Sequence, residues 1–214
     1  MKKIILIGDS IRMGYCKYVK EALLDTAEVF YPDENCRFAE YVLRYLGDWK
    51  KQGKWGDDVD LVHWNAGLWD CLELYGDEPL TSLSYYGEAI ARIDKRIRMF
   101  FPKAKVVFAT STSIVESGYG KDFCRHNATI EKYNQAALRA LSGTDTVIDD
   151  LYSVSLKCTE EHRSDMTHFN TPSGTELMGG AVLSVICREL GIDAGQINVE
   201  SFCPENYSSY SIGY

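Results

Sequence analysis

Short apolar runs alternate along the chain with longer segments in which apolar residues recur at helical spacing. The runs are mostly continuous and rich in β-branched residues, which is typical of strands covered on both faces. They predict strands over residues 3–8, 27–31, 58–66, 104–110 and 145–150. The amphipathic segments predict helices over residues 13–25, 37–51, 84–100, 125–141 and 173–190.

Local signals mark the ends of the later helices. Pro102 follows the segment 84–100, and helices usually end before a proline. Gly143 stands just beyond 125–141, where a glycine commonly terminates a helix. Thr171 is a suitable N-cap for the last helix, with Pro172 in its first turn.

The alternation of strands and helices predicts an α/β protein with a parallel sheet between two layers of helices. We expect a single domain over residues 1–214, with a flavodoxin-like five-stranded sheet in the order 2-1-3-4-5. The stretch 197–214 is rich in Ser and Tyr and lacks periodicity, so it predicts an irregular tail. In such sheets ligands bind beyond the carboxyl ends of the strands.

The balance of charge narrows the range of partners. The formal net charge is −8 and the sequence pI is about 5.1, which argues against nucleic acid and against anionic membranes. A neutral small molecule is compatible with this surface. The apolar run Ile4–Ile7 is only four residues long, far short of a signal segment or a membrane span, so a cytoplasmic protein is expected. Nothing in the sequence predicts the oligomeric state.

The cysteine and histidine pattern gives no metal or redox motif. The seven cysteines are widely spaced and include no C-x-x-C pair, which favours free thiols in a reducing compartment. His126 and His162 are read as having no carboxylate or cysteine partner at ligand spacing. We therefore expect neither a metal site nor a cofactor.

The first candidate for chemistry is Gly8-Asp9-Ser10, at the end of the first predicted strand. A serine at a strand-to-helix turn exposes its hydroxyl at the edge of the sheet. Its own N–H lies at a helix N-terminus, where developing negative charge is stabilised. An N-cap serine without any catalytic role gives the same three residues.

The second candidate is the D-x-x-H motif formed by Asp165 and His168. This spacing lets the carboxylate hold one imidazole nitrogen while the other nitrogen faces Ser10, as in a Ser-His-Asp triad. Alone, the motif also fits a loop carboxylate that bonds its own backbone. Together the two motifs are more informative, because both follow strands of one parallel sheet and should meet at its carboxyl edge.

Residues 4–15 (IILIGDSIRMGY) resemble the first sequence block of the SGNH, or GDSL-type, hydrolases, and residues 165–175 (DMTHFNTPSGT) resemble the last. The resemblance implies a three-layer α/β/α fold and hydrolysis of acyl esters by Ser10, His168 and Asp165. It also implies three oxyanion donors: the serine N–H, a glycine N–H of the second block and an asparagine side chain of the third.

The second and third blocks depart from the family pattern. Cys36 stands where the second block has glycine. Its backbone N–H can still donate, although cysteine tolerates a positive φ poorly, and a buried thiol without a role in the site is an equal alternative. In the third block, Gly67 keeps the glycine, but Trp69 replaces the asparagine and offers an indole N–H. Asn65 is a second candidate donor, with capping of the loop as its alternative role. Asp9, beside the serine, completes the candidate site.

The sequence therefore predicts a serine esterase that acts on small acyl esters, with acetylated carbohydrates as a candidate class. Trp49, Trp55, Trp69 and the many tyrosines are candidates for stacking on a sugar, although most aromatic residues pack in the core, which is the favoured interpretation. One alternative is a non-catalytic binding module on the same scaffold, which the departures in the second and third blocks favour. A nucleotide-binding protein is disfavoured, because no phosphate-binding glycine motif follows the first strand.

Overall fold

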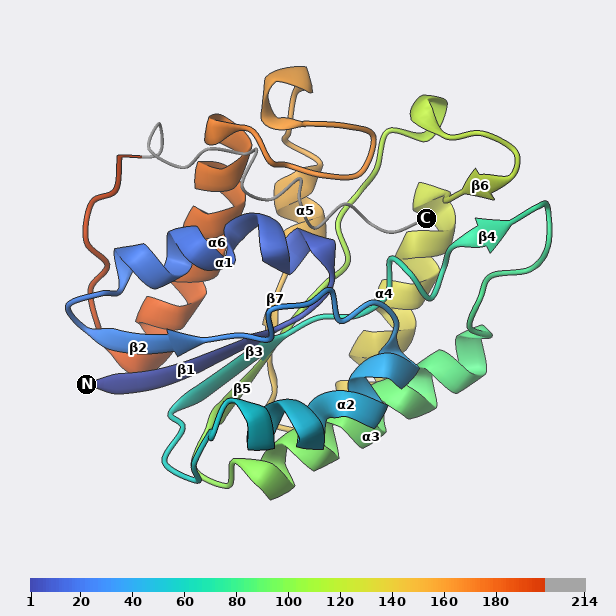
Figure 1. The fold of residues 1–214 in the computed structure, drawn as a ribbon. Helices are drawn as coiled ribbons and strands as arrows, with labels where there is room; N and C mark the ends of the chain where they lie inside the picture. Colours follow the sequence, from blue (N-terminus) through green and yellow to red (C-terminus); the bar gives the residue numbers. More distant parts are fainter. Residues whose placement is uncertain (199–214) are drawn as a thin grey trace.

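The computed structural model describes residues 1–198, and a five-stranded parallel sheet lies at its centre (Figure 1). The strands are β1 (Lys2–Ile7), β2 (Ala27–Phe30), β3 (Leu61–Trp64), β5 (Lys105–Ala109) and β7 (Val147–Asp149). Their order across the sheet is β2-β1-β3-β5-β7. Counted along the chain, these five strands stand in the order 2-1-3-4-5, so the predicted topology is confirmed.

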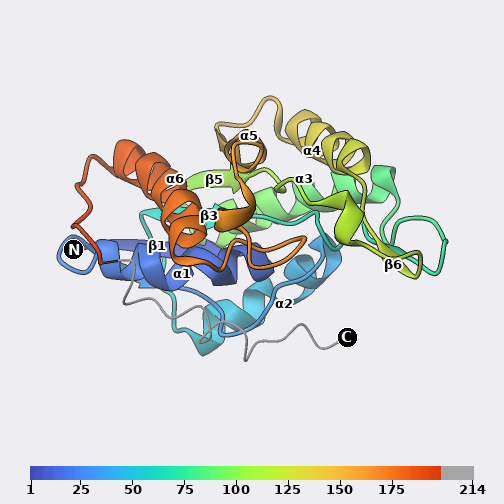
Figure 2. The same ribbon diagram turned by 90° about the horizontal axis from the view of Figure 1, so that it is seen from above.

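Helices cover both faces of the sheet and form the outer layers of an α/β/α sandwich. They are α1 (Ser10–Ala22), α2 (Ala39–Gln52), α3 (Leu83–Phe100), α4 (Asn127–Leu141), α5 (Leu151–Ser155) and α6 (Pro172–Leu190). α1 packs against α6 on one face, whereas α2 packs against α3 on the other and α3 against α4. Figure 2 shows α1 and α6 together on one side of the molecule, with α4 towards the opposite side.

The central strands are largely apolar because both of their faces are covered. Ile4 to Ile7 of β1 are completely buried, and so are all four residues of β3. This burial explains why the two strands read as continuous apolar runs rather than as alternating patterns. The same burial fixes the position of β1, which leads directly into the turn that carries Ser10.

The predicted helix ends are confirmed. The Thr171 hydroxyl accepts a hydrogen bond from the Gly174 N–H at 3.0 Å, and Pro172 is the first residue of α6. α4 ends at Leu141, and Gly143 follows with a φ of +94°, a conformation that glycine adopts without strain. The first helix begins at Ser10, three residues earlier than the periodicity predicted, because Asp9 caps it.

Several short elements escaped the sequence analysis. β4 (Glu73–Leu74) and β6 (Phe123–Cys124) form a small antiparallel pair outside the main sheet. The helix α5 and two 3₁₀ turns, η1 (Glu116–Gly118) and η2 (Glu160–His162), were also not predicted. Elements of two to five residues are too short to show a period in the sequence.

Most of the predicted tail, residues 197–214, lies outside the described residues. Within residues 1–198 no helix combines the length and the apolar character that crossing a membrane requires.

Candidate active site

Ser10, His168 and Asp165 form one chain of hydrogen bonds at the carboxyl edge of the sheet. The Ser10 Oγ lies 2.8 Å from the His168 Nε2, and the His168 Nδ1 lies 2.8 Å from the Asp165 Oδ2. If Nδ1–H donates to the carboxylate, Nε2 is left free to accept the serine hydroxyl. The structure thus brings together three side chains from opposite ends of the sequence.

The turn that carries Ser10 is fixed by buried polar contacts. Asp9 is completely buried, and its Oδ1 accepts the N–H of Ile11 at 3.0 Å, which caps α1. Arg12 is also buried and donates to the carbonyl oxygens of Gly8 and Glu34, so it ties the turn to the loop after β2. Ser10 is the first residue of the helix, where backbone N–H groups have no intrahelical acceptor.

The loop that carries the histidine is equally constrained. The Asp165 Oδ1 accepts the N–H groups of Thr167 at 2.6 Å and His168 at 2.8 Å, so the carboxylate closes a tight turn. The segment after His168 packs closely against α1 at Gly14, because a Cβ on Gly14 would lie 2.5 Å from the Asn170 Oδ1. The His168 imidazole is therefore presented to Ser10 by a rigid loop.

The pKa of Asp165 reflects these contacts. Partial burial alone would raise it, but the hydrogen bond and charge of His168 and the two N–H groups lower the pKa to about 2. Asp165 is therefore ionised at neutral pH, as a carboxylate must be to hold and stabilise the imidazole.

A cavity of about 130 Å³ opens directly beside the serine. It is lined by Ser10, Leu68, Trp69, Phe123, Arg125, Asp165, Met166, Thr167 and His168. Four of these nine residues are apolar or aromatic and five are polar or charged, so the cavity combines an apolar wall with several polar groups. The cavity places a bound molecule within reach of the serine hydroxyl.

Comparison with known proteins supports this architecture. No family model matches the chain, and no curated protein does. Solved structures do match: a lipase/acylhydrolase from Enterococcus faecalis is 20% identical, with a TM-score of 0.70 over 92% of this chain and 100% of that one. A GDSL-like lipase from Bacteroides thetaiotaomicron is 14% identical, with a TM-score of 0.67 over 87% and 88%. The acetyl xylan esterase AlAXEase is 16% identical, with a TM-score of 0.67 over 86% and 99%.

The chain has the SGNH (GDSL-type) hydrolase fold. The likeness extends over most of the chain, 92% of it in the first of these comparisons. At such low identity the likeness concerns the fold, and the chemistry has to be argued from the residues of this chain.

The expectation for Cys36 in this SGNH fold is wrong in the structure. Its N–H donates to the carbonyl oxygen of Gly8 at 3.1 Å, so it does not point to a bound substrate. The thiol is buried beside the Arg12 guanidinium, and burial raises its pKa to about 11. The left-handed conformation occurs one residue later, at Arg37 with a φ of +48°. Cys36 thus avoids strain by pairing with the serine turn.

Asp9 and Asn65 lie behind the serine rather than in the cavity. A Cβ on Gly8 would stand 1.8 Å from the Asn65 Oδ1, so glycine is required there for the two segments to meet. Burial raises the pKa of Asp9, whereas the neighbouring Asn65 side chain lowers it by a smaller amount. The Asp9 Oδ2 nevertheless has no partner at hydrogen-bond geometry within residues 1–198. Both residues therefore support the turn.

The third block divides its roles among consecutive residues. Gly67 has a φ of +147°, and a Cβ there would lie 2.2 Å from the Ser111 Oγ, so only glycine fits. Trp69 is half-buried and lines the cavity. Asp70 is buried and accepts the N–H of Ala39 at the start of α2, and burial raises its pKa to about 7.

Arg125 is a cavity residue that the sequence analysis missed. Its guanidinium donates to the Leu68 carbonyl and to the Tyr119 hydroxyl, the latter at 3.1 Å, and lies 5.8 Å from the centre of the Trp69 ring. Within residues 1–198 no carboxylate lies within ion-pair distance of it. A positive charge therefore lies at the cavity. No local sequence motif predicts it.

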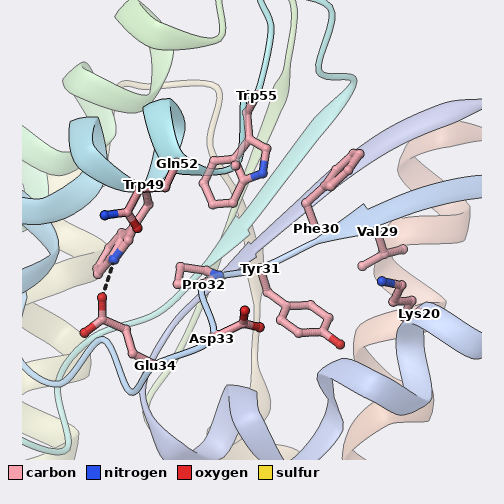
Figure 3. Close-up of a pocket in the computed structure, with 11 residues that line it drawn as sticks. Lys20, Val29, Phe30, Tyr31, Pro32, Asp33, Glu34, Trp49, Gln52 and Trp55 are labelled. Atoms are coloured by element: carbon pink, nitrogen blue, oxygen red, sulfur yellow. Dashed lines mark hydrogen bonds between the residues drawn. The ribbon is translucent and has the colours of Figure 1, made fainter.

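A second cavity of about 440 Å³ lies between β2, α1 and α2, and Figure 3 shows its lining. Trp49 and Trp55 line this cavity and are buried, which agrees with packing in the core and places neither of them in the cavity beside Ser10. Trp49 instead donates to the Glu34 carboxylate at 2.6 Å. This cavity is larger than the one beside the serine, but its lining includes no serine, cysteine or histidine. Ser10, His168 and Asp165 all line the smaller cavity.

The sequence-based reading of His126 is also corrected. Its Nε2 lies 3.9 Å from the Cys124 Sγ and 3.8 Å from the Glu73 Oε2, and its Nδ1 lies 3.2 Å from the Glu116 Oε2. Glu73 reaches it through the pairing of β4 with β6. That pairing is not visible in the sequence, which is why Glu73 was missed, whereas Cys124 stands only two residues before His126 and could have been noticed.

Proposed function

We propose that the protein is a serine-dependent ester hydrolase that acts on small acyl esters. The observation that carries this proposal is the chain of two 2.8 Å contacts from the Ser10 Oγ through His168 to Asp165, at the mouth of a cavity. A serine hydroxyl is a weak nucleophile until a base removes its proton, and this geometry supplies both the base and the group that orients it.

In the first half of the reaction, the His168 Nε2 accepts the proton of the Ser10 hydroxyl as the oxygen attacks the ester carbonyl. The imidazolium that forms is stabilised by the ionised Asp165. The same proton then passes to the leaving alcohol, and an acyl group remains on the Ser10 oxygen. In the second half, His168 activates a water molecule that attacks the acyl-serine and releases the acid.

The negative charge on the carbonyl oxygen needs donors in both halves. The Ser10 N–H lies at the beginning of α1, where the helix dipole and the unpaired N–H groups favour an anion. The Trp69 indole N–H is the second donor that we propose, because Trp69 lines the cavity, whereas Asn65 and Cys36 do not. Loss of one such donor typically lowers kcat by about 10²–10³-fold.

The size and lining of the cavity favour a short acyl group. A volume of about 130 Å³ is well below the roughly 300–1,000 Å³ of sites for drug-sized molecules. The Trp69 ring at its rim offers an apolar surface to the alcohol portion of the ester. Acetylated carbohydrates are the substrate class that we propose, and the structural likeness to an acetyl xylan esterase supports this choice.

The decisive experiment measures hydrolysis of short-chain nitrophenyl esters by the wild type and by Ser10→Ala. We expect kcat to fall at least about 10³-fold in this variant, because the nucleophile is lost. Ser84→Ala is the matched control, since Ser84 lies exposed on α3, and it should retain wild-type activity. A fluorophosphonate probe should label Ser10 in the wild type and in the control.

Equal turnover in Ser10→Ala and the wild type would refute the proposal, as would labelling at another serine. The absence of any turnover in the wild type, across nitrophenyl esters and acetylated sugars, would favour the non-catalytic binding module. A panel of esters with lengthening acyl chains then tests the substrate class, and we expect kcat/KM to be highest for acetyl.

A further inference from the structure

The small β4–β6 pair gathers three side chains of different chemistry on one face. Glu73 of β4 and Cys124 of β6 stand directly opposite each other in the antiparallel register. Directly opposed residues share a face of the ladder and have neighbouring side chains. His126 follows two residues after Cys124 in extended conformation, so its side chain emerges on the same side. The pair lies at the edge of the molecule, away from the main sheet (Figure 1).

The three potential donor atoms form a nearly equilateral triangle. The Glu73 Oε2 lies 3.8 Å from the Cys124 Sγ, the Cys124 Sγ lies 3.9 Å from the His126 Nε2, and the His126 Nε2 lies 3.8 Å from the Glu73 Oε2. Tetrahedral zinc, with bonds of about 2.0–2.3 Å, separates such ligand atoms by about 3.4–3.6 Å. Each edge of the triangle needs to shorten by only a few tenths of an ångström.

A fourth residue fixes the orientation of the histidine. The Glu116 Oε2 lies 3.2 Å from the His126 Nδ1, while the Glu116 Oε1 accepts the N–H of Asn127 at 2.8 Å. When Nδ1–H donates to this carboxylate, the lone pair of Nε2 is directed at Cys124 and Glu73. A carboxylate on the far nitrogen of a metal-binding histidine is the usual outer support of a zinc site.

We propose that Glu73, Cys124 and His126 bind a zinc ion, with a water molecule as the fourth ligand. The set of one thiolate, one imidazole and one carboxylate is within the ligand chemistry that zinc prefers. On binding, the Cys124 thiol releases its proton to solvent and the thiolate bonds to the metal, so affinity decreases as the pH falls. The His126 side chain is 49% exposed and that of Glu73 is 22% exposed, which leaves an entry path.

The ion would hold one wall of the cavity from its outer side. Phe123 and Arg125, which alternate with Cys124 and His126 along the chain, line the cavity beside Ser10. Cys124 and His126 are not part of that lining. The zinc site is thus structural, joining β4, β6 and the start of α4, and it takes no part in the triad.

The proposal can be tested by metal titration of the full chain, after treatment with a chelator under reducing conditions. Zn²⁺ is titrated in competition with a chromophoric chelator, and Co²⁺ serves as a spectroscopic probe. We expect one equivalent of either ion to bind, and Co²⁺ to show a thiolate charge-transfer band with the intense ligand-field bands of a four-coordinate site. Zn²⁺ should also raise the thermal unfolding midpoint, because it binds the folded state.

Variants then assign the ligands. Cys124→Ser should abolish the charge-transfer band and the thermal shift, and His126→Ala should weaken binding at least about tenfold. Glu116→Gln should weaken it by about 10–100-fold without removing a ligand, because it disturbs only the orientation of the histidine. Cys187→Ser is the matched control: this thiol of α6 is half-buried as well, belongs to no such cluster within residues 1–198, and should leave binding unchanged.

Absence of saturable binding of both ions to the wild type would overturn the proposal. So would a Co²⁺ spectrum or a zinc affinity that Cys124→Ser and His126→Ala leave unchanged. Circular dichroism checks that each variant is folded. Should either Cys124→Ser or His126→Ala fail to fold, the other still tests the site. None of these readouts depends on esterase activity.

Discussion

Two histidine–aspartate pairs in this molecule have almost the same geometry but opposite surroundings. His168 lies 2.8 Å from Asp165 in a loop, and its second nitrogen meets the Ser10 hydroxyl at 2.8 Å. His63 of β3 lies 2.9 Å from Asp149 of β7, and both side chains are buried within the layers of the fold. Its second nitrogen meets no hydrogen-bond partner within residues 1–198.

The comparison shows that a histidine–aspartate contact is not itself a catalyst. Tyr15 of α1 packs edge-on against the His63 ring, with 6.1 Å between ring centres, and closes that pair off from solvent. His168 instead borders a cavity and contacts the Ser10 hydroxyl. We therefore assign a role in stability to the pair His63–Asp149, and a role in chemistry to the pair His168–Asp165. Substitutions in one pair at a time test this division of roles.

The largest expected effect comes from Asp165→Asn. We expect kcat to fall by about 10³–10⁴-fold, because an asparagine in this position can hold the imidazole in the wrong tautomer. Thermal unfolding should change little, since the Asp165 side chain is 42% exposed. Ester hydrolysis and unfolding are measured on the same preparations.

Asp25→Asn is the control for this variant. Asp25 is exposed in the turn before β2, at the end of the sheet opposite to Ser10, and its replacement should leave kcat unchanged. If Asp165→Asn keeps activity within about tenfold of the wild type, Asp165 is not the residue that orients His168.

The next effect is on stability, from Asp149→Ala. Removing this carboxylate leaves the His63 imidazole buried without its partner, and we expect the free energy of unfolding to decrease by about 2–4 kcal/mol. Well below the unfolding transition, kcat should remain close to the wild-type value, because no cavity residue changes. Urea unfolding and ester kinetics measure the two quantities separately.

The double replacement His63→Leu with Asp149→Val sharpens this result. Both polar groups are then replaced by apolar ones, and we expect most of the lost stability to return, to within about 1 kcal/mol of the wild type. If the double variant is as unstable as the sum of its single variants, packing around Tyr15 rather than the contact between His63 and Asp149 explains the loss.

The same comparison shows what the sequence could predict. The strands β1 and β3 are largely apolar runs, and the turn Gly8-Asp9-Ser10 and the D-x-x-H spacing are local patterns, so the fold and the residues of the proposed triad could be found without coordinates. The pairing of His63 with Asp149 joins residues 86 positions apart. It could not be found in this way, since neither residue carries a local signal.

The same limit applies around the cavity. Arg125 lies between the two-residue strand β6 and α4, and so short an element leaves no periodicity to detect. The positive φ expected at Cys36 occurs at Arg37, because a hydrogen bond between Cys36 and Gly8 sets the register of that loop. Contacts between distant segments decide such details, and a single sequence does not contain them in readable form.

The smallest expected effect concerns acid. Partial burial would raise the pKa of Asp165, but His168 and the two N–H groups lower it to about 2, whereas an aspartate in an unfolded chain titrates near 3.9. The unfolded chain thus binds a proton at a pH where the folded carboxylate remains charged, so folding is favoured above about pH 4 and this contribution is lost as the pH falls towards 2.

Unfolding midpoints measured from pH 5 to pH 2 test this expectation. The wild type should lose stability over this range faster than Asp165→Asn, which has no carboxylate to protonate, and the difference should be modest because solvent screens a side chain that is 42% exposed. In His168→Gln, where the imidazole no longer lowers the pKa of Asp165, the acid-dependent part should shrink. Parallel curves for the wild type and Asp165→Asn would mean that the contact between Asp165 and His168 contributes nothing to the folded state in solution.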